Sequence, residues 1–224
     1  MLLAAGVLSA LAFAALPALA SADEFQAHCE GAATCTGEIT GGVAELRNSG
    51  GEVIKCTGLT GSTGFTSTTT TGTASFIFTG CREQVTIFKF QCRTPGSTNN
   101  GEITVNNLTY HVINLEHTPT TKPGIKFTNV SVTFTCAGFS DKTVTGSVVG
   151  TIEESNTVCE HEMSTMAVTF EESATQGTQK WTQTETTGTK TDLISNNDAG
   201  GAYSTSAQVG TGIIHWNHPV RVTC

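Results

Sequence analysis

A run of alternating side chains near the middle of the chain restricts its fold more than any other feature of the sequence. Apolar residues or cysteine occupy every even position from Val130 to Cys136, and serine or threonine occupies every odd position. A period of two in β-branched and aromatic residues indicates a strand with one buried and one solvated face. A cysteine of the buried parity also suggests a covalent link to a neighbour. We therefore expect Ile125–Cys136 to be a core strand.

Cysteine content adds a second restriction. The chain has eight cysteines, an even number that predicts four disulfides in an exported protein. No close C-x-x-C pair is present, so a cysteine-based metal site is not expected. Sequence spacing suggests the local pairs Cys29–Cys35 and Cys136–Cys159. The remaining cysteines stay unassigned, and they are Cys56, Cys81, Cys92 and Cys224.

The beginning of the chain is typical of a secretory signal. Residues 1–22 carry no charge and are rich in Ala and Leu, and they end in the small-residue pattern Ala18-Leu19-Ala20 followed by Ser21-Ala22. This pattern predicts cleavage after Ala20 or Ala22 and a secreted, extracellular protein. The alternative is a retained membrane anchor. Residues 23–224 are expected to form a single β domain, with a possible division into halves near the proline-containing segment 118–124.

Most of the remaining chain consists of short strand-like segments separated by Gly, Asn and Asp turns, with no apolar repeat of helical period. This pattern predicts an antiparallel β-sandwich with disulfides, and a closed antiparallel β-barrel is the alternative. Among the details, we expect Ala74–Thr79 and Val85–Cys92 to form a hairpin and Thr178–Thr186 to be a strand. Asn106-Asn107 indicates either a hairpin turn or a bulge.

Charge disfavours two classes of partner. The formal net charge is −8, and the 11 basic residues are scattered singly. A chain without a basic stripe is poorly suited to nucleic acid or to anionic lipid. We therefore expect no nucleic-acid partner, and no membrane partner once the signal has been cleaved.

Catalytic chemistry has little support in the sequence. Gly61-Ser62-Thr63-Gly64 lacks the spacing of a nucleophile elbow. The most suggestive group is Glu160 with His161, which a fold would have to bring to His111 or His215 to form a metal or hydrolytic site. We therefore assign no catalytic residue, no metal ligand and no cofactor, and we lean against an enzyme.

The two tryptophans, Trp181 and Trp216, are the candidate ligand-binding residues. Trp181 lies in the polar segment Gln179–Thr184, and Trp216 lies between His215 and Asn217. A tryptophan on a polar strand is either a core anchor or a platform on which a ligand stacks.

The signal, the Thr- and Gly-rich strands and two short phrases resemble secreted β-rich proteins of soil actinobacteria. The phrases are Ile54-Lys55-Cys56-Thr57 and Phe78-Thr79-Gly80-Cys81. The resemblance implies export and a β-rich fold. That group has no established activity, so the resemblance implies no site residues.

These observations favour a secreted, non-catalytic binding or structural module for an extracellular ligand or protein. Two alternatives remain: a carrier that holds an apolar ligand in a barrel cavity, and an extracellular hydrolase with a His/Glu site. A cavity of a few hundred Å³ lined by Phe and Val would favour the carrier. The oligomeric state is left open by the sequence.

Overall fold

The computed structural model describes residues 25–85, 87–115, 122–136, 141–153, 159–181, 193–196 and 202–223. Within these ranges all regular secondary structure is β-strand. The strands are β1 (Gln26–Cys29), β2 (Thr34–Asn48), β3 (Val53–Cys56), β4 (Gly58–Thr66), β5 (Thr71–Thr79), β6 (Arg82–Val85), β7 (Phe88–Arg93), β8 (Ile103–Asn114), β9 (Pro123–Cys136), β10 (Asp141–Glu153), β11 (Glu162–Phe170), β12 (Leu193–Asn196) and β13 (Tyr203–Thr223). The expected signal segment 1–22 and Cys224 lie outside the described residues.

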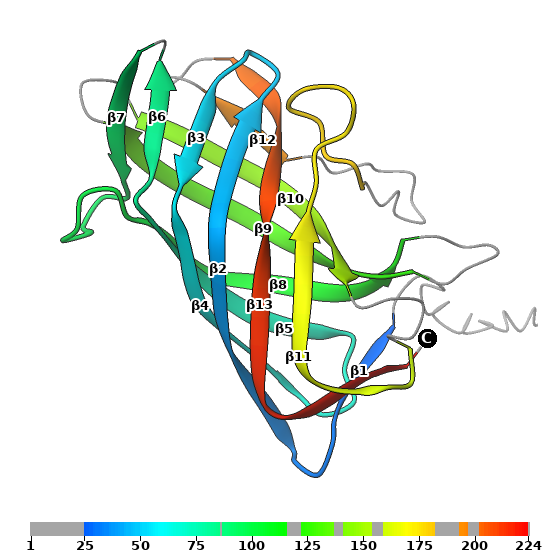
Figure 1. The fold of residues 1–224 in the computed structure, drawn as a ribbon. Helices are drawn as coiled ribbons and strands as arrows, with labels where there is room; N and C mark the ends of the chain where they lie inside the picture. The colour runs from blue at the N-terminus through cyan, green and yellow to red at the C-terminus, as the bar shows by residue number, and fades with distance from the viewer. Residues whose placement is uncertain are drawn as a thin grey trace, which may run out of the picture.

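The strands form one antiparallel sheet that returns to its starting strand. From β2, hydrogen-bonded neighbours run through β4, β5, β8, β9, β10, β11 and β13 and back to β2. Figure 1 shows β2, β13 and β11 along one wall, while β8, β9 and β10 cross behind them. The two walls face one another across a shared core. We call this closed path the lower ring.

Toward the end of the molecule that carries the β6–β7 hairpin, different strands complete the circle. There the path runs from β2 through β3, β6, β7, β9, β10, β12 and β13 to β2. We call this path the upper ring. The long strands β2, β9, β10 and β13 belong to both rings and hold them together (Figure 1). Because the other strands reach along only part of the axis, the sheet is closed unevenly.

The predicted core strand is confirmed. In β9, Val130, Phe134 and Cys136 are buried and Val132 is half-buried, while the intervening positions are more exposed. The predicted all-β antiparallel fold with disulfides is confirmed as well. Its facing walls are sandwich-like, and the pairings join their edges.

Three disulfides link described residues. Cys29–Cys35 closes a short loop between β1 and β2, as predicted. Cys92–Cys136 joins β7 to β9, and Cys56–Cys81 joins the end of β3 to the segment before β6. The predicted pair Cys136–Cys159 is therefore wrong, because Cys136 faces Cys92 on the adjacent strand. Cys159 is also disulfide-bonded, and no described cysteine is free.

The predicted hairpin between Ala74–Thr79 and Val85–Cys92 is wrong. β5 pairs with β4 and β8 in the lower ring, whereas β6 and β7 form their own hairpin in the upper ring. The chain passes from one ring to the other at Gly80-Cys81, where the disulfide to Cys56 holds it. Sequence proximity alone therefore misassigned the partners.

Three other segments can be compared with what the sequence suggested for them. Asn107 has a positive φ of 57° within β8, where Ala74 and Phe76 pair with Leu108 and Val105, so the bulge alternative is correct. The sequence pattern suggests two strands at Tyr203–Val209 and Ile213–Val222. In the structure they are parts of one continuous strand, β13. Residues 178–181 form no strand, and residues 182–186 lie outside the described part of the chain.

Candidate functional site

The walls of the sheet enclose an apolar cavity of about 110 Å³. Aliphatic side chains from β2, β3, β4, β8, β9, β10 and β12 line it, together with the rings of Phe76, Phe78, Phe127, Phe134 and Phe170. Gln208 and Thr211, both on β13, are the polar residues among the described lining. Apolar cavities of this size class stay dry and accept small apolar guests.

The cavity exists because two neighbouring strands contribute little volume to the interior. Gly210 and Gly212 on β13 line the cavity, and Ala44 lines it from β2. Gly210 has a φ of +143°, and a Cβ there would lie 2.9 Å from the Val43 carbonyl oxygen, so this position requires glycine. A bulge between Gly210 and Gly212 also interrupts the pairing with β2. The missing side chains leave space that the facing phenylalanines do not fill.

Aromatic rings form the floor of the cavity. The Phe127 ring lies 5.3 Å from the Phe76 ring, 5.8 Å from the Tyr110 ring and 6.0 Å from the Phe170 ring, measured between centroids. Burial raises the pKa of Tyr110 to about 12, so its phenol is neutral at physiological pH. The same four rings also border a smaller apolar hollow of about 20 Å³, so the aromatic layer lies between the two spaces.

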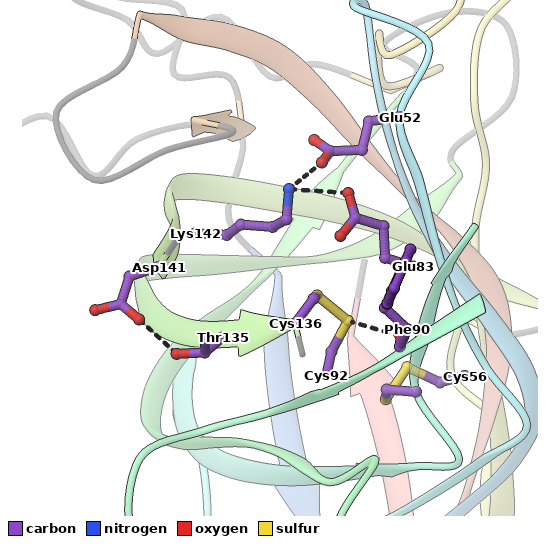
Figure 2. The surroundings of a disulfide bond; sticks show 10 residues. Glu52, Cys56, Glu83, Phe90, Cys92, Thr135, Cys136, Asp141 and Lys142 are labelled. Carbon is purple, nitrogen blue, oxygen red and sulfur yellow. Dashed lines mark hydrogen bonds and ion pairs between the residues drawn. A yellow bond between two sulfur atoms is a disulfide. The ribbon is translucent and has the colours of Figure 1, made fainter. Parts of the chain in front are cut away.

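Three charged side chains, Glu52, Glu83 and Lys142, lie together in the upper ring, and we call them the charged cluster. Lys142 Nζ contacts Glu52 Oε1 and lies 3.0 Å from Glu83 Oε1. Figure 2 shows the ammonium between the two carboxylates, near the Cys92–Cys136 disulfide. The side chains of Lys142 and Glu83 are only 4% and 5% exposed, so water screens this contact weakly.

The cluster has an imbalance of hydrogen-bonding groups. Asn48 donates a hydrogen bond of 2.8 Å from Nδ2 to Glu52 Oε2, which gives that carboxylate a second partner. Glu83 Oε2, in contrast, is buried and accepts no hydrogen bond from the described residues. A buried carboxylate oxygen without a donor is unusual, because burial without a partner is unfavourable.

Burial also changes the acidity of the cluster. It raises the pKa of Glu83 to about 7, and the neighbouring Glu52 carboxyl adds to that rise while Lys142 opposes it. Burial acts to lower the pKa of Lys142, but its hydrogen bonds to Glu52 and Glu83 outweigh burial and raise the pKa above its usual range. The lysine is therefore charged at neutral pH, and Glu83 gains and loses its proton there.

The charged cluster and the apolar cavity share a wall. A small hollow of about 10 Å³ is bordered by Asn48, Glu52 and Lys142 on its polar side. Four apolar residues border both this hollow and the cavity, and they are Leu46, Ile54, Phe134 and Val144. The interior thus changes from apolar to charged across one layer of side chains.

Trp216 lies at the lower end, where its ring packs edge-on against Phe65 at 5.4 Å and lies over Gly37. Its Nε1 is buried and has no partner among the described residues. Trp216 also borders an open polar groove of about 610 Å³ that includes Glu38 and His215. Its predicted role in ligand binding stays a prediction.

Trp181 lies elsewhere, in the segment after β11. Its ring has Lys122 Nζ at 4.6 Å and Lys180 Nζ at 5.6 Å, and its Nε1 donates to Glu171 Oε2 at 3.4 Å. Cation–π contacts of this kind hold the ring in place. These partners differ from those of Trp216, which packs against Phe65, so the two candidate ligand-binding residues have different surroundings.

His161 and His215, two of the three histidines of the hydrolase alternative, have different contacts. His161 Nδ1 lies 3.1 Å from the carbonyl oxygen of Cys159, and Glu160 pairs with Arg221. His215 lies 3.5 Å from Thr40 Oγ1 on the outer face. Within the described ranges no group of three metal-binding side chains occurs.

The class of protein defined by these features is a disulfide-linked antiparallel β-protein with an apolar interior cavity. No family model matches the chain, and no curated protein or solved structure is detectably similar to it. In the described part of the chain, no helix has the length and hydropathy needed to cross a bilayer.

Sequence reasoning named an interior cavity only as an alternative and located none of its lining residues, and it missed the charged cluster. One signal for the cavity is present: Gly210 and Gly212 share a parity with the buried Ile214 within one strand. One signal for the cluster is that Lys142 shares a parity with the buried Val144. Their partners lie far away in sequence, so neither signal identifies the site alone.

Proposed function

We propose that this protein binds a small apolar molecule inside its sheet and acts as an exported carrier or binding module. The observation that carries the proposal is the apolar cavity of about 110 Å³, with its aromatic floor. Disulfides are consistent with an oxidising compartment, which supports export. The cavity is smaller than the few hundred Å³ of a typical ligand pocket, so the apolar part of the ligand is about the size of one benzene ring.

A cavity-filling variant tests this proposal. Ala44→Leu adds three carbon atoms at a position that lines the cavity. Toluene is a suitable probe, and its binding is measured by calorimetry or by the rise in Tm that a ligand selective for the folded state produces. We expect Ala44→Leu to weaken toluene binding at least tenfold. The filled protein should be as stable as the wild type or up to about 2 kcal/mol more stable, because buried carbons stabilise by about 0.8 kcal/mol each and side-chain ordering offsets part of this.

Val43→Leu provides a matched control, since Val43 is the adjacent residue and is 52% exposed. This variant should bind toluene as the wild type does. If the wild-type protein does not bind toluene, or if Ala44→Leu binds it equally well, the cavity is not a ligand site.

A further inference from the structure

We propose that the ligand of this cavity is amphipathic, with an apolar body in the cavity and a cationic or hydrogen-bond-donating head group that binds Glu83. This inference rests on the proposed function and names the chemistry of the same site.

The position of Glu83 in the sheet supports this assignment. Gln208 pairs with Leu46, Leu46 with Ile54, and Ile54 with Glu83, in one row across β13, β2, β3 and β6. Directly paired residues point to the same face of a sheet. Because Gln208, Leu46 and Ile54 line the cavity, Glu83 faces the same interior one strand beyond it, about 4.8 Å further along.

The unpartnered oxygen of Glu83 defines the chemistry of the head group. Glu83 is 3% exposed, and its Oε2 has no donor among the described residues. When Glu83 is ionised, its carboxylate is only an acceptor, so the group that satisfies it at pH 8 must be an N–H or O–H donor. A charged donor gives the strongest bond, because ionised partners roughly double the strength of a hydrogen bond.

The charge of the cluster distinguishes between possible head groups. Among the described residues, the carboxylates of Glu52 and Glu83 face the Lys142 ammonium, so these three groups together carry an excess negative charge when Glu83 is ionised. A cationic head compensates this charge, a neutral hydroxyl satisfies only the hydrogen bond, and a carboxylate head is repelled. Fatty-acid-like ligands are therefore disfavoured despite the apolar cavity.

The single layer of side chains between the cavity and the charged cluster limits the length of the ligand. Ile54 borders both the cavity and the small hollow beside Glu52 and Lys142. Because Ile54 pairs with Glu83 on the next strand, we expect a head group on a short arm to reach Glu83 past the Ile54 side chain. A single ring with a one-carbon arm has the required size, since the cavity holds about one ring.

Four compounds of nearly equal shape separate the head-group chemistry from the apolar contact: toluene, benzyl alcohol, benzylamine and benzoate. Calorimetry at pH 8 on the wild type and on Glu83→Gln measures the contribution of the carboxylate. We expect Glu83→Gln to weaken benzylamine binding at least tenfold, to weaken benzyl alcohol binding less, and to change toluene binding less than twofold. Benzoate should bind the wild type more weakly than toluene does. Glu153→Gln is a matched control, because Glu153 is exposed at the end of β10 and lines neither the cavity nor the polar groove beside Trp216, so it should leave all four affinities unchanged.

The two proposals fail in different ways. If toluene binds but benzylamine affinity is the same in the wild type and Glu83→Gln, the head-group assignment is wrong and the apolar site stands. If neither compound binds, the proposed function itself is wrong.

If Glu83→Gln does not fold, the pH dependence of ligand binding to the wild type tests the head-group assignment instead. An aliphatic ammonium stays charged between pH 5.5 and pH 8, whereas Glu83 changes its charge in that range beside Glu52 and Lys142. Benzylamine affinity should increase at least fivefold across this range while toluene affinity stays constant. Equal pH profiles for the two compounds would overturn the assignment.

Discussion

Replacing Lys142 by methionine tests whether the charged cluster is held together as its geometry indicates. Methionine keeps most of the length of the side chain but removes the ammonium that lies between Glu52 and Glu83. The Lys142 side chain is 4% exposed, and the carboxylates it contacts are 15% and 5% exposed. Removing one member of a buried ion pair leaves charge uncompensated and typically destabilises by about 3–5 kcal/mol. We expect a loss of that size in the free energy of unfolding at pH 8.

The loss should depend on pH in a defined direction. Below pH 6 the Glu83 carboxyl is largely protonated, because its pKa is raised to about 7, and removal of Lys142 should raise it further. Fewer uncompensated charges then remain in the interior, so we expect the cost of Lys142→Met at pH 5 to be less than half of that at pH 8. Urea denaturation with the disulfides intact, followed by tryptophan fluorescence, measures both values.

A triple variant provides the control for lost packing. Replacing Glu52 and Glu83 by glutamine in the Lys142→Met background removes all three charges. Neutral replacements of a buried ion group are often as stable as the original, so the triple variant should recover most of the lost stability at pH 8. A loss below about 1 kcal/mol for Lys142→Met, or an equal loss at both pH values, would show that the three groups are solvated rather than buried together.

Two further predictions concern pH and the disulfides. Because Glu83 has a higher pKa in the folded chain than the usual value near 4.5, folding favours its protonated form. The contribution of Glu83 to the free energy of unfolding is therefore greatest below pH 4.5 and declines as the pH rises to about 7. Urea titrations from pH 5 to pH 8 should therefore show a declining contribution in the wild type that is absent in Glu83→Gln. Removing Cys92–Cys136, which spans 44 residues, should destabilise by about 4 kcal/mol in the loop-entropy model, against about 2 kcal/mol for Cys29–Cys35, which spans 6. Paired Cys→Ala variants compared by thermal unfolding check this order, and a larger loss for the short loop would contradict it.

Local patterns predicted the parts of the fold that local physics determines. The alternation from Val130 to Cys136 identified β9 and its buried face, because burial of one face of a strand imposes a period of two. The same parity also indicated that Cys136 would be linked to a neighbouring strand. It could not indicate which strand, since Cys92 and Cys159 both lie at accessible separations in sequence. The hydrogen-bond register between β7 and β9 made that choice.

The choice of strand partners is where sequence reasoning failed. Ala74–Thr79 and Val85–Cys92 are separated by a plausible turn, yet they belong to different rings. Whether a strand turns back or crosses to another ring depends on all other pairings. The position of the cavity could not be predicted from the sequence for the same reason. Glycine at 210 and 212 predicts missing side-chain volume, but larger side chains on the opposite wall could have filled that space.

Two disulfides lie where the upper ring meets the cavity, which strands of both rings line. A cavity of about 110 Å³ forgoes roughly 2–3 kcal/mol of packing, and the charged cluster in the upper ring adds a desolvation cost beside it. The segments there are short, since β3, β6 and β12 have four residues each. Cys92–Cys136 connects β7 to β9 in this ring, Cys56–Cys81 connects β3 to the segment before β6, and Cys56 itself lines the cavity. Covalent links thus hold together the region in which packing contributes least. This arrangement allows a cavity and a buried charge to lie side by side in a folded chain.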